Sequence, residues 1–245
     1  MIKNLIYISI ISLLLHSCTK NNEIRIQYTG DVYISVKSIN NTIKYSLEGL
    51  VLANYIIKNA NIKTPTGSNI KMKEFGETGT KFSLIANSYS SKLPDIGKYQ
   101  LTVNIKNKGE RYISNTLSSE TIKPAKINSA EVKDSMGKRF LLINFSQLEK
   151  ADNYQIELLD SNDNILYISP LLETIYKKDE NGKLFITKNQ IVKINEPNSD
   201  NEDRFSRWVN SDQKLYDISK IKIKSILMEK NNEFIQSISE SEYTL

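Results

Sequence analysis

The chain has 245 residues, a formal net charge of +5 and 25% charged residues, with only one cysteine and one histidine. Its positive and negative charges are interleaved, without the basic stripe that marks a nucleic-acid interface, so no nucleic-acid partner is expected. A single cysteine also excludes a disulfide-stapled scaffold and a thiol-pair redox centre.

The N-terminus is typical of an exported lipoprotein. Lys3 precedes an apolar run over residues 5–15, which is too short to span a membrane, and Ser17 stands before Cys18. This order of a basic start, an apolar core and a small residue predicts a signal peptide. The stretch from Leu15 to Cys18 resembles the bacterial lipobox, which implies cleavage between Ser17 and Cys18 and diacylglyceride on Cys18. The alternative is an ordinary secreted protein with a chance cysteine.

We therefore expect a signal peptide over residues 1–17 and a lipidated tether over residues 18–23, with a lipid anchor in the membrane. Thr19 takes the place of the aspartate that resembles an inner-membrane retention signal, which favours the outer membrane. Residues 19–23 carry a single acid, so the sequence leaves open whether the periplasmic or the surface face is occupied.

The predicted processing leaves few catalytic residue types. The only histidine is His16, which would leave with the signal peptide, and Cys18 would be consumed by lipid. Ser-His-Asp and Cys-His nucleophiles and the usual zinc sites need these residues. We expect a non-enzymatic protein without metal or other cofactor, although carboxylate chemistry, serine–lysine chemistry and calcium binding remain open.

Strand patterns dominate the rest of the chain. β-branched and aromatic residues alternate with polar ones, which predicts half-buried strands, and clusters rich in Gly, Asn, Asp and Pro separate them. The predicted strands cover residues 24–28, 32–36, 99–105, 127–132, 140–145, 154–158, 184–186 and 221–226. The prediction is an all-β fold of two tandem β-sandwiches.

The first predicted domain, residues 24–122, resembles an immunoglobulin-like sandwich. Asp95, Gly97 and Tyr99 are similar to the Asp-x-Gly-x-Tyr tyrosine corner of that fold, in which the tyrosine hydroxyl bonds to the chain just upstream. The second cysteine of a true immunoglobulin domain would fall at Leu101 and is absent. A generic glycine-containing turn is the alternative.

The second predicted domain, residues 123–245, begins at a short linker around Pro124. Its hairpin over residues 127–145, followed by Ala151 and Tyr154 at the entry to a middle strand, resembles the opening of a fibronectin type III domain. Such a sandwich needs no disulfide, which agrees with the cysteine count.

The layout as a whole resembles a family of Bacteroidota lipoproteins of unknown function that are often found with TonB-dependent outer-membrane transporters. The similar segments, in order, are Cys18 with Lys20, residues 60–64 with Gly67, Glu74 before Gly76, residues 97–103, residues 109–112 with 114–116, residues 122–124, residues 221–228 and residues 234–235. This resemblance implies an envelope location and a transporter as partner, and it carries over no catalytic residue.

Four further sites are candidates. Trp208, the only tryptophan, could stack on a sugar or a partner protein, although a lone tryptophan is more often a core residue. The Asp134-Ser135-Met136 stretch resembles an O-glycosylation signal of the same bacterial group, which would place the sugar on Ser135. The acidic residues Asp200, Glu202 and Asp203, and the turn over residues 160–164, could bind calcium through oxygen atoms but are more typical of polar loops.

The sequence thus favours a membrane-anchored accessory or adaptor protein of the outer membrane, with a transporter or another envelope protein as partner. The alternative is a glycan-binding or adhesive surface protein that uses Trp208. A hydrolase is disfavoured because no two carboxylates are paired by their position in the sequence.

Overall fold

The computed structural model describes residues 25–197, 207–209, 213–229, 231 and 234–245. The predicted all-β class is confirmed, since these residues form strands joined by turns, with a single short 3₁₀ turn at Leu215–Asp217. None of the described residues forms a helix of the length and apolar character that crossing a membrane requires. The chain folds as two compact units.

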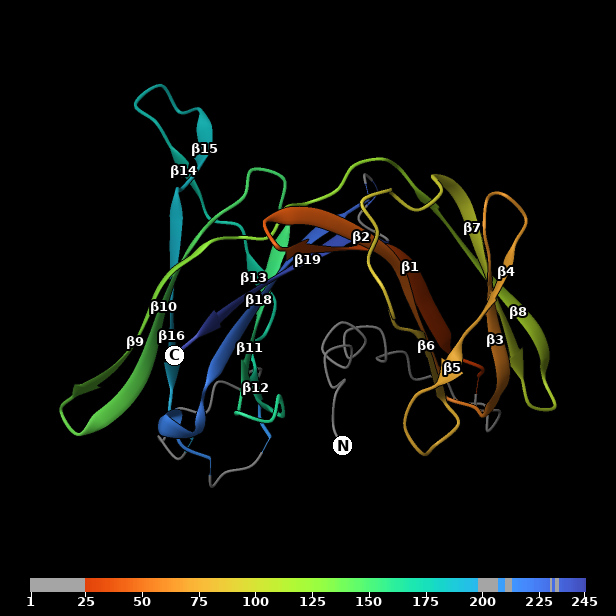
Figure 1. The fold of residues 1–245 in the computed structure, drawn as a ribbon, viewed down its shortest axis with the longest axis horizontal. Helices are drawn as coiled ribbons and strands as arrows, with labels where there is room; N and C mark the ends of the chain where they lie inside the picture. Colours follow the sequence, from red (N-terminus) through yellow and green to blue (C-terminus); the bar gives the residue numbers. More distant parts are fainter. Residues whose placement is uncertain (1–24, 198–206, 210–212, 230, 232–233) are drawn as a thin grey trace. The chain divides into compact units, whose positions relative to one another are not determined.

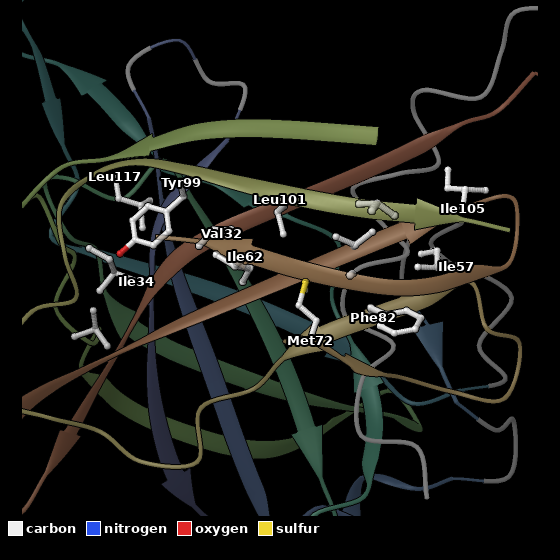
Figure 2. Close-up of a cluster of buried hydrophobic side chains, with 14 residues drawn as sticks. Val32, Ile34, Ile57, Ile62, Met72, Phe82, Tyr99, Leu101, Ile105 and Leu117 are labelled. Carbon is white, nitrogen blue, oxygen red and sulfur yellow. The ribbon is translucent and has the colours of Figure 1, made fainter. Parts of the chain in front are cut away.

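The N-terminal unit is a sandwich of two antiparallel sheets (Figure 1). One sheet has the order β5 (Lys73–Glu74), β6 (Lys81–Leu84), β2 (Thr42–Ala53), β1 (Tyr28–Ile39) and the start of β19 (Ile235–Thr244). The other has the order β4 (Asn69–Lys71), β3 (Ile57–Lys63), β7 (Gly97–Ile105) and β8 (Gly109–Leu117). Alternate residues of the strands point inward, as a period of two requires. The core therefore combines Val32, Ile34 and Val36 of β1 with Tyr99, Leu101, Val103 and Ile105 of β7 (Figure 2).

The β1–β2 hairpin is the longest pairing of this unit, running without interruption from Tyr28↔Ala53 to Ile39↔Thr42. Asn40 and Asn41 form its two-residue turn, with φ of 51° and 59°. A two-residue hairpin turn of this kind needs positive φ at both positions, and asparagine tolerates it better than most residues.

A segment from the end of the sequence completes the N-terminal unit. Residues Leu227–Ile238, which contain the end of β18 (Lys220–Met228) and the start of β19 (Ile235–Thr244), belong to it. Gln236 shows why: its side chain donates to the carbonyls of Ser118 and Glu120 at 3.0 and 2.9 Å and accepts from the Ser118 N–H at 3.1 Å. The assignment of all residues 123–245 to the second domain therefore differs from the structure at this segment.

The C-terminal unit comprises Ile122–Ile226 and Ser239–Leu245. A three-stranded sheet has the order β16 (Asn189–Asn195), β10 (Lys138–Ser146) and β9 (Ile127–Ser135). The other sheet contains β17 (Arg207–Trp208), β12 (Ile165–Ile168), β11 (Asn153–Leu159), β18 and β19, with β13 (Leu172–Glu173) also paired to β11. A separate two-stranded hairpin consists of β14 (Tyr176–Lys178) and β15 (Leu184–Ile186).

The core of the C-terminal unit lies between its two larger sheets. Phe145 of β10 and Tyr154 of β11 are fully buried and meet edge to face, with ring centroids 4.9 Å apart. The Tyr154 hydroxyl accepts a hydrogen bond from the Leu148 N–H at 2.6 Å, which ties the loop before β11 to the core. Burial raises the pKa of this phenol, so Tyr154 stays neutral and keeps a structural role.

Candidate interaction surface

The residues of the predicted lipid anchor, Ser17 and Cys18, lie outside the described residues, as do Asp200, Glu202 and Asp203 of the candidate calcium loop. Cleavage, lipidation and calcium binding at these positions stay predictions.

Asp95, Gly97 and Tyr99 have the geometry of a tyrosine corner. The Tyr99 hydroxyl donates to the Asp95 carbonyl at 2.5 Å, and Gly97 adopts φ of 126°, which favours glycine. The Asp95 carboxylate accepts from the Thr66 hydroxyl at 2.9 Å, which ties the corner to the β3–β4 turn. Burial raises the pKa of Tyr99 to about 12, so this residue closes the fold and offers no reactive phenolate.

Trp208 lies in β17, paired with Tyr167 of β12, and is half-buried. Its ring packs at a tilt against the buried Tyr167 ring, with centroids 5.2 Å apart, and its Nε1 donates to the Asn195 carbonyl at 3.1 Å. The ring and the indole nitrogen both have partners within the unit, which is the usual arrangement of a structural tryptophan.

Ser135 ends β9 at the tip of the β9–β10 hairpin and is exposed. Met136, next to it, adopts φ of 54° and is fully exposed. The neighbouring Asp134 forms an exposed ion pair, with its Oδ2 3.6 Å from Nε of Arg139. A modifying enzyme could reach this tip, and O-glycosylation of Ser135 stays a prediction.

The turn over residues 160–164 uses the carboxylate of Asp160 for its own backbone. Asp160 accepts from the N–H groups of Asn162 and Asn164, both at 2.8 Å, and from the Asn164 side chain at 2.9 Å. The bond from the Asn164 side chain is the main reason that the pKa of Asp160 is lowered. Within the part of the chain that the structure describes, no three His, Cys, Asp or Glu side chains are grouped as metal ligands.

A charged cluster lies on the sheet of the C-terminal unit that contains β11, β18 and β19. Lys224 of β18 has its Nζ 2.9 Å from Oε1 of Glu157 in β11 and 3.7 Å from Oε1 of Glu240 in β19. The side chains of Lys224 and Glu157 are only 9% and 2% exposed. The single ammonium group therefore lies between two carboxylates in a setting that holds little water, and the pair that it forms with Glu157 is almost fully buried.

Several exposed apolar side chains lie on the β14–β15 hairpin, which extends beyond the ends of β10 and β16 in Figure 1. Leu184 is 60% exposed, Tyr176 53% and Phe185 47%, and Ile175 just before β14 is exposed as well. Single apolar residues on a surface are ordinary, whereas several large ones on one short element make it a candidate interaction surface. We call residues 175–187 the apolar hairpin.

The apolar hairpin is held firmly at its base by Gln147. The buried Gln147 side chain accepts from the Ile175 N–H at 2.7 Å, donates to the Thr187 carbonyl at 2.8 Å and also contacts the Thr187 hydroxyl. Its backbone N–H donates to the Lys188 carbonyl at 3.0 Å. A single side chain thus fixes both strands where they leave the sandwich, and a fixed element loses little conformational entropy when it binds.

Sequence reasoning found the strand over residues 184–186 but not its exposure, because an apolar strand pattern is ordinarily that of a buried strand. It also missed the Lys224–Glu157 pair, whose partners are 67 residues apart in the chain. The Asn- and Gly-containing stretch over residues 179–182 forms the turn of the hairpin, where Asp179 accepts from the N–H groups of Asn181 and Lys183.

No family model and no curated protein matches the chain. Among solved structures, it is similar to a DUF4785 family protein from Legionella pneumophila, with 10% identity, 89% of this chain and 55% of that chain covered, and a TM-score of 0.26. It is also similar to a structure concerned with host cell surface retention of a bacterial ice-binding adhesin, with 10% identity, 91% of this chain and 65% of that chain covered, and a TM-score of 0.25. A tetra-tandem repeat from the extending region of a large adhesion protein is 12% identical, with 89% of this chain and 74% of that chain covered and a TM-score of 0.20.

The chain thus spans about half of the first of these structures and just under two thirds of the second. TM-scores of this size carry no functional argument for the present chain.

Proposed function

We propose that the protein is a non-enzymatic, membrane-anchored lipoprotein that binds another envelope protein as an accessory or adaptor at the bacterial outer membrane. The observation that carries the proposal is the apolar hairpin, in which Tyr176, Leu184 and Phe185 are presented to solvent on a clamped two-stranded element. Burying a leucine or phenylalanine side chain stabilises by about 1.5–3 kcal/mol. A partner that covers the exposed parts of these side chains would therefore stabilise the complex relative to the separate proteins.

A TonB-dependent transporter is the partner that the family resemblance suggests, and the lipid on Cys18 would supply the location. Glycan binding through Trp208 is the alternative. We favour the protein partner because the Trp208 ring and its Nε1 already have partners in the unit, whereas the hairpin side chains are open.

Replacing both Leu184 and Phe185 with serine is expected to reduce recovery of the partner at least tenfold, because apolar anchors dominate interface energies. The measurement is quantitative mass spectrometry of proteins cross-linked to the tagged lipoprotein in intact cells and purified from solubilised outer membrane. The free energy of unfolding of the protein itself should change far less than partner recovery, since Leu184 is 60% and Phe185 47% exposed.

Tyr216→Ser is the matched control, since Tyr216 is 72% exposed and lies on the 3₁₀ turn Leu215–Asp217 instead of the hairpin. Equal partner recovery from both variants and the parent protein would refute the hairpin as the binding element.

The predicted anchor has its own test. Cys18→Ser is expected to move the protein from the membrane fraction to the soluble fraction, because the lipid chains provide about 0.8 kcal/mol for each buried CH₂ group. The measurement is membrane fractionation with mass spectrometry of the N-terminal peptide. An unmodified Cys18 in the parent protein, or unchanged membrane association of the variant, would contradict the anchor.

A further inference from the structure

In the described part of the chain, the apolar hairpin has a strand edge that is not joined by a further strand. β14 and β15 pair with each other, and no third strand joins them among the described residues. A two-stranded ribbon by itself is marginally stable in water and gains from an additional strand. The Gln147 clamp keeps the ribbon in place, so its outer edge is displayed in a defined orientation.

The backbone hydrogen bonds between the two strands show which N–H and C=O groups of β15 point away from β14. The Thr187 N–H donates to the Ile175 carbonyl at 3.1 Å, and the Asp179 N–H donates to the Lys183 carbonyl at 2.9 Å. In an antiparallel ladder the residues between such pairs direct their N–H and C=O groups to the opposite side. The backbone groups of Leu184 and Ile186 therefore point away from β14, toward the free edge of β15.

Side chains along the same edge favour an apolar strand as the occupant. Leu184 and Ile186 share one face of the hairpin with Tyr176, whose register partner is Ile186. Exposed Lys183 and Lys188 stand at the two ends of β15. An added strand would place alternate apolar side chains beside Leu184 and Ile186, and acidic residues at its ends would meet the two lysines.

From this geometry we infer that β15 binds an extended segment of another envelope protein by strand addition, the segment having alternating apolar residues flanked by acidic ones. The inference rests on the proposed function and names the kind of partner.

The inference is tested with the photoreactive residue p-benzoyl-phenylalanine in place of Lys188, in the full-length lipoprotein in intact cells. The expected result is a cross-link to an apolar, acid-flanked segment of one envelope protein, located by mass spectrometry. Hydrogen exchange on the purified complex should then show slowed exchange of the Leu184 and Ile186 amides relative to the free protein.

Two variants separate backbone pairing from side-chain contact. Ile186→Pro removes the outward N–H without removing a bond to β14, whereas Ile186→Ala shortens the side chain and keeps the N–H. The cross-link is expected to fall at least tenfold in the proline variant and less than threefold in the alanine variant. The hydrogen-exchange result does not depend on how either variant folds.

Each outcome decides between the claims. If the proline variant cross-links as well as the alanine variant and the Leu184 and Ile186 amides stay unprotected, strand addition is wrong while the adaptor function stands. A cross-link to lipid or to a second copy of this chain also overturns strand addition. If no protein is captured from position 188 and the serine variants of the hairpin lose no partner, the proposed function fails as well.

Discussion

Replacing Asp31 with alanine is expected to lower the free energy of unfolding of the N-terminal unit by about 3 kcal/mol, because three donors lose their acceptor. The Asp31 carboxylate accepts from the Val32 N–H at 2.8 Å, the Asn115 side chain at 3.0 Å and the Ile235 N–H at 2.6 Å. The last bond holds the segment Leu227–Ile238 against β1 within the unit. Urea denaturation monitored by tyrosine fluorescence measures the loss.

The same carboxylate makes the stability of the N-terminal unit depend on pH. Burial raises the pKa of Asp31 from 3.8 to about 8, and Glu229 adds to the rise, while the bonds from Ile235 and Val32 oppose it. The folded state thus keeps a proton that the unfolded state releases between these values. Its contribution to stability is complete below pH 4 and is lost as the pH rises through 8.

Urea denaturation from pH 5 to pH 9 should therefore show stability that decreases with pH in the parent protein and a flatter profile in Asp31→Asn. The asparagine variant should also be less stable at every pH, because its amide must direct an N–H toward either Ile235 or the other donors. Glu77→Ala, an exposed acid of the same unit, is the control and should change stability by less than about 0.5 kcal/mol. An equally small effect of Asp31→Ala would refute this role.

The part of the fold that was predictable from sequence is the part with local patterns. Residues 99–105 alternate clearly, and β7 spans Gly97–Ile105 with its odd-numbered side chains from Tyr99 onward in the core. The β1–β2 hairpin was not predicted, because its turn is Asn40-Asn41 and lacks the glycine that usually signals such a turn. Strand signals are readable within about ten residues, but pairings that depend on unusual turns are not.

Long-range features could not be read from the sequence for a different reason. The hydrogen bond from the Ile235 N–H to the Asp31 carboxylate joins residues that are 204 positions apart in the chain. No local pattern in the sequence of residues 227–238 indicates that this segment completes the N-terminal unit. The apolar hairpin posed the opposite problem. Phe185 and Leu184 have the composition of a buried strand, and only the position of the hairpin outside the sandwich leaves them exposed.

The charged cluster of the C-terminal unit carries the other large expected effect. Lys224→Met should lower the free energy of unfolding of that unit by about 3–5 kcal/mol, because it removes the ammonium group that lies 2.9 Å from the buried Glu157 carboxylate. Glu157 and Glu240 would then face each other across the position of Lys224, from β11 and β19 on either side of β18. Guanidinium denaturation with the near-ultraviolet signal of the aromatic core measures the change.

A double-mutant cycle with Glu157→Gln separates the lost ion pair from lost packing. If charge is the cause, adding Glu157→Gln to Lys224→Met should recover about half of the lost stability, since a neutral amide then replaces the buried Glu157 carboxylate. Lys133→Met breaks the exposed pair with Glu131, whose atoms are 3.3 Å apart, and should cost less than about 1 kcal/mol. Equal losses at Lys224 and Lys133, or no recovery in the double variant, would mean that the cluster is held by packing and not by its charges.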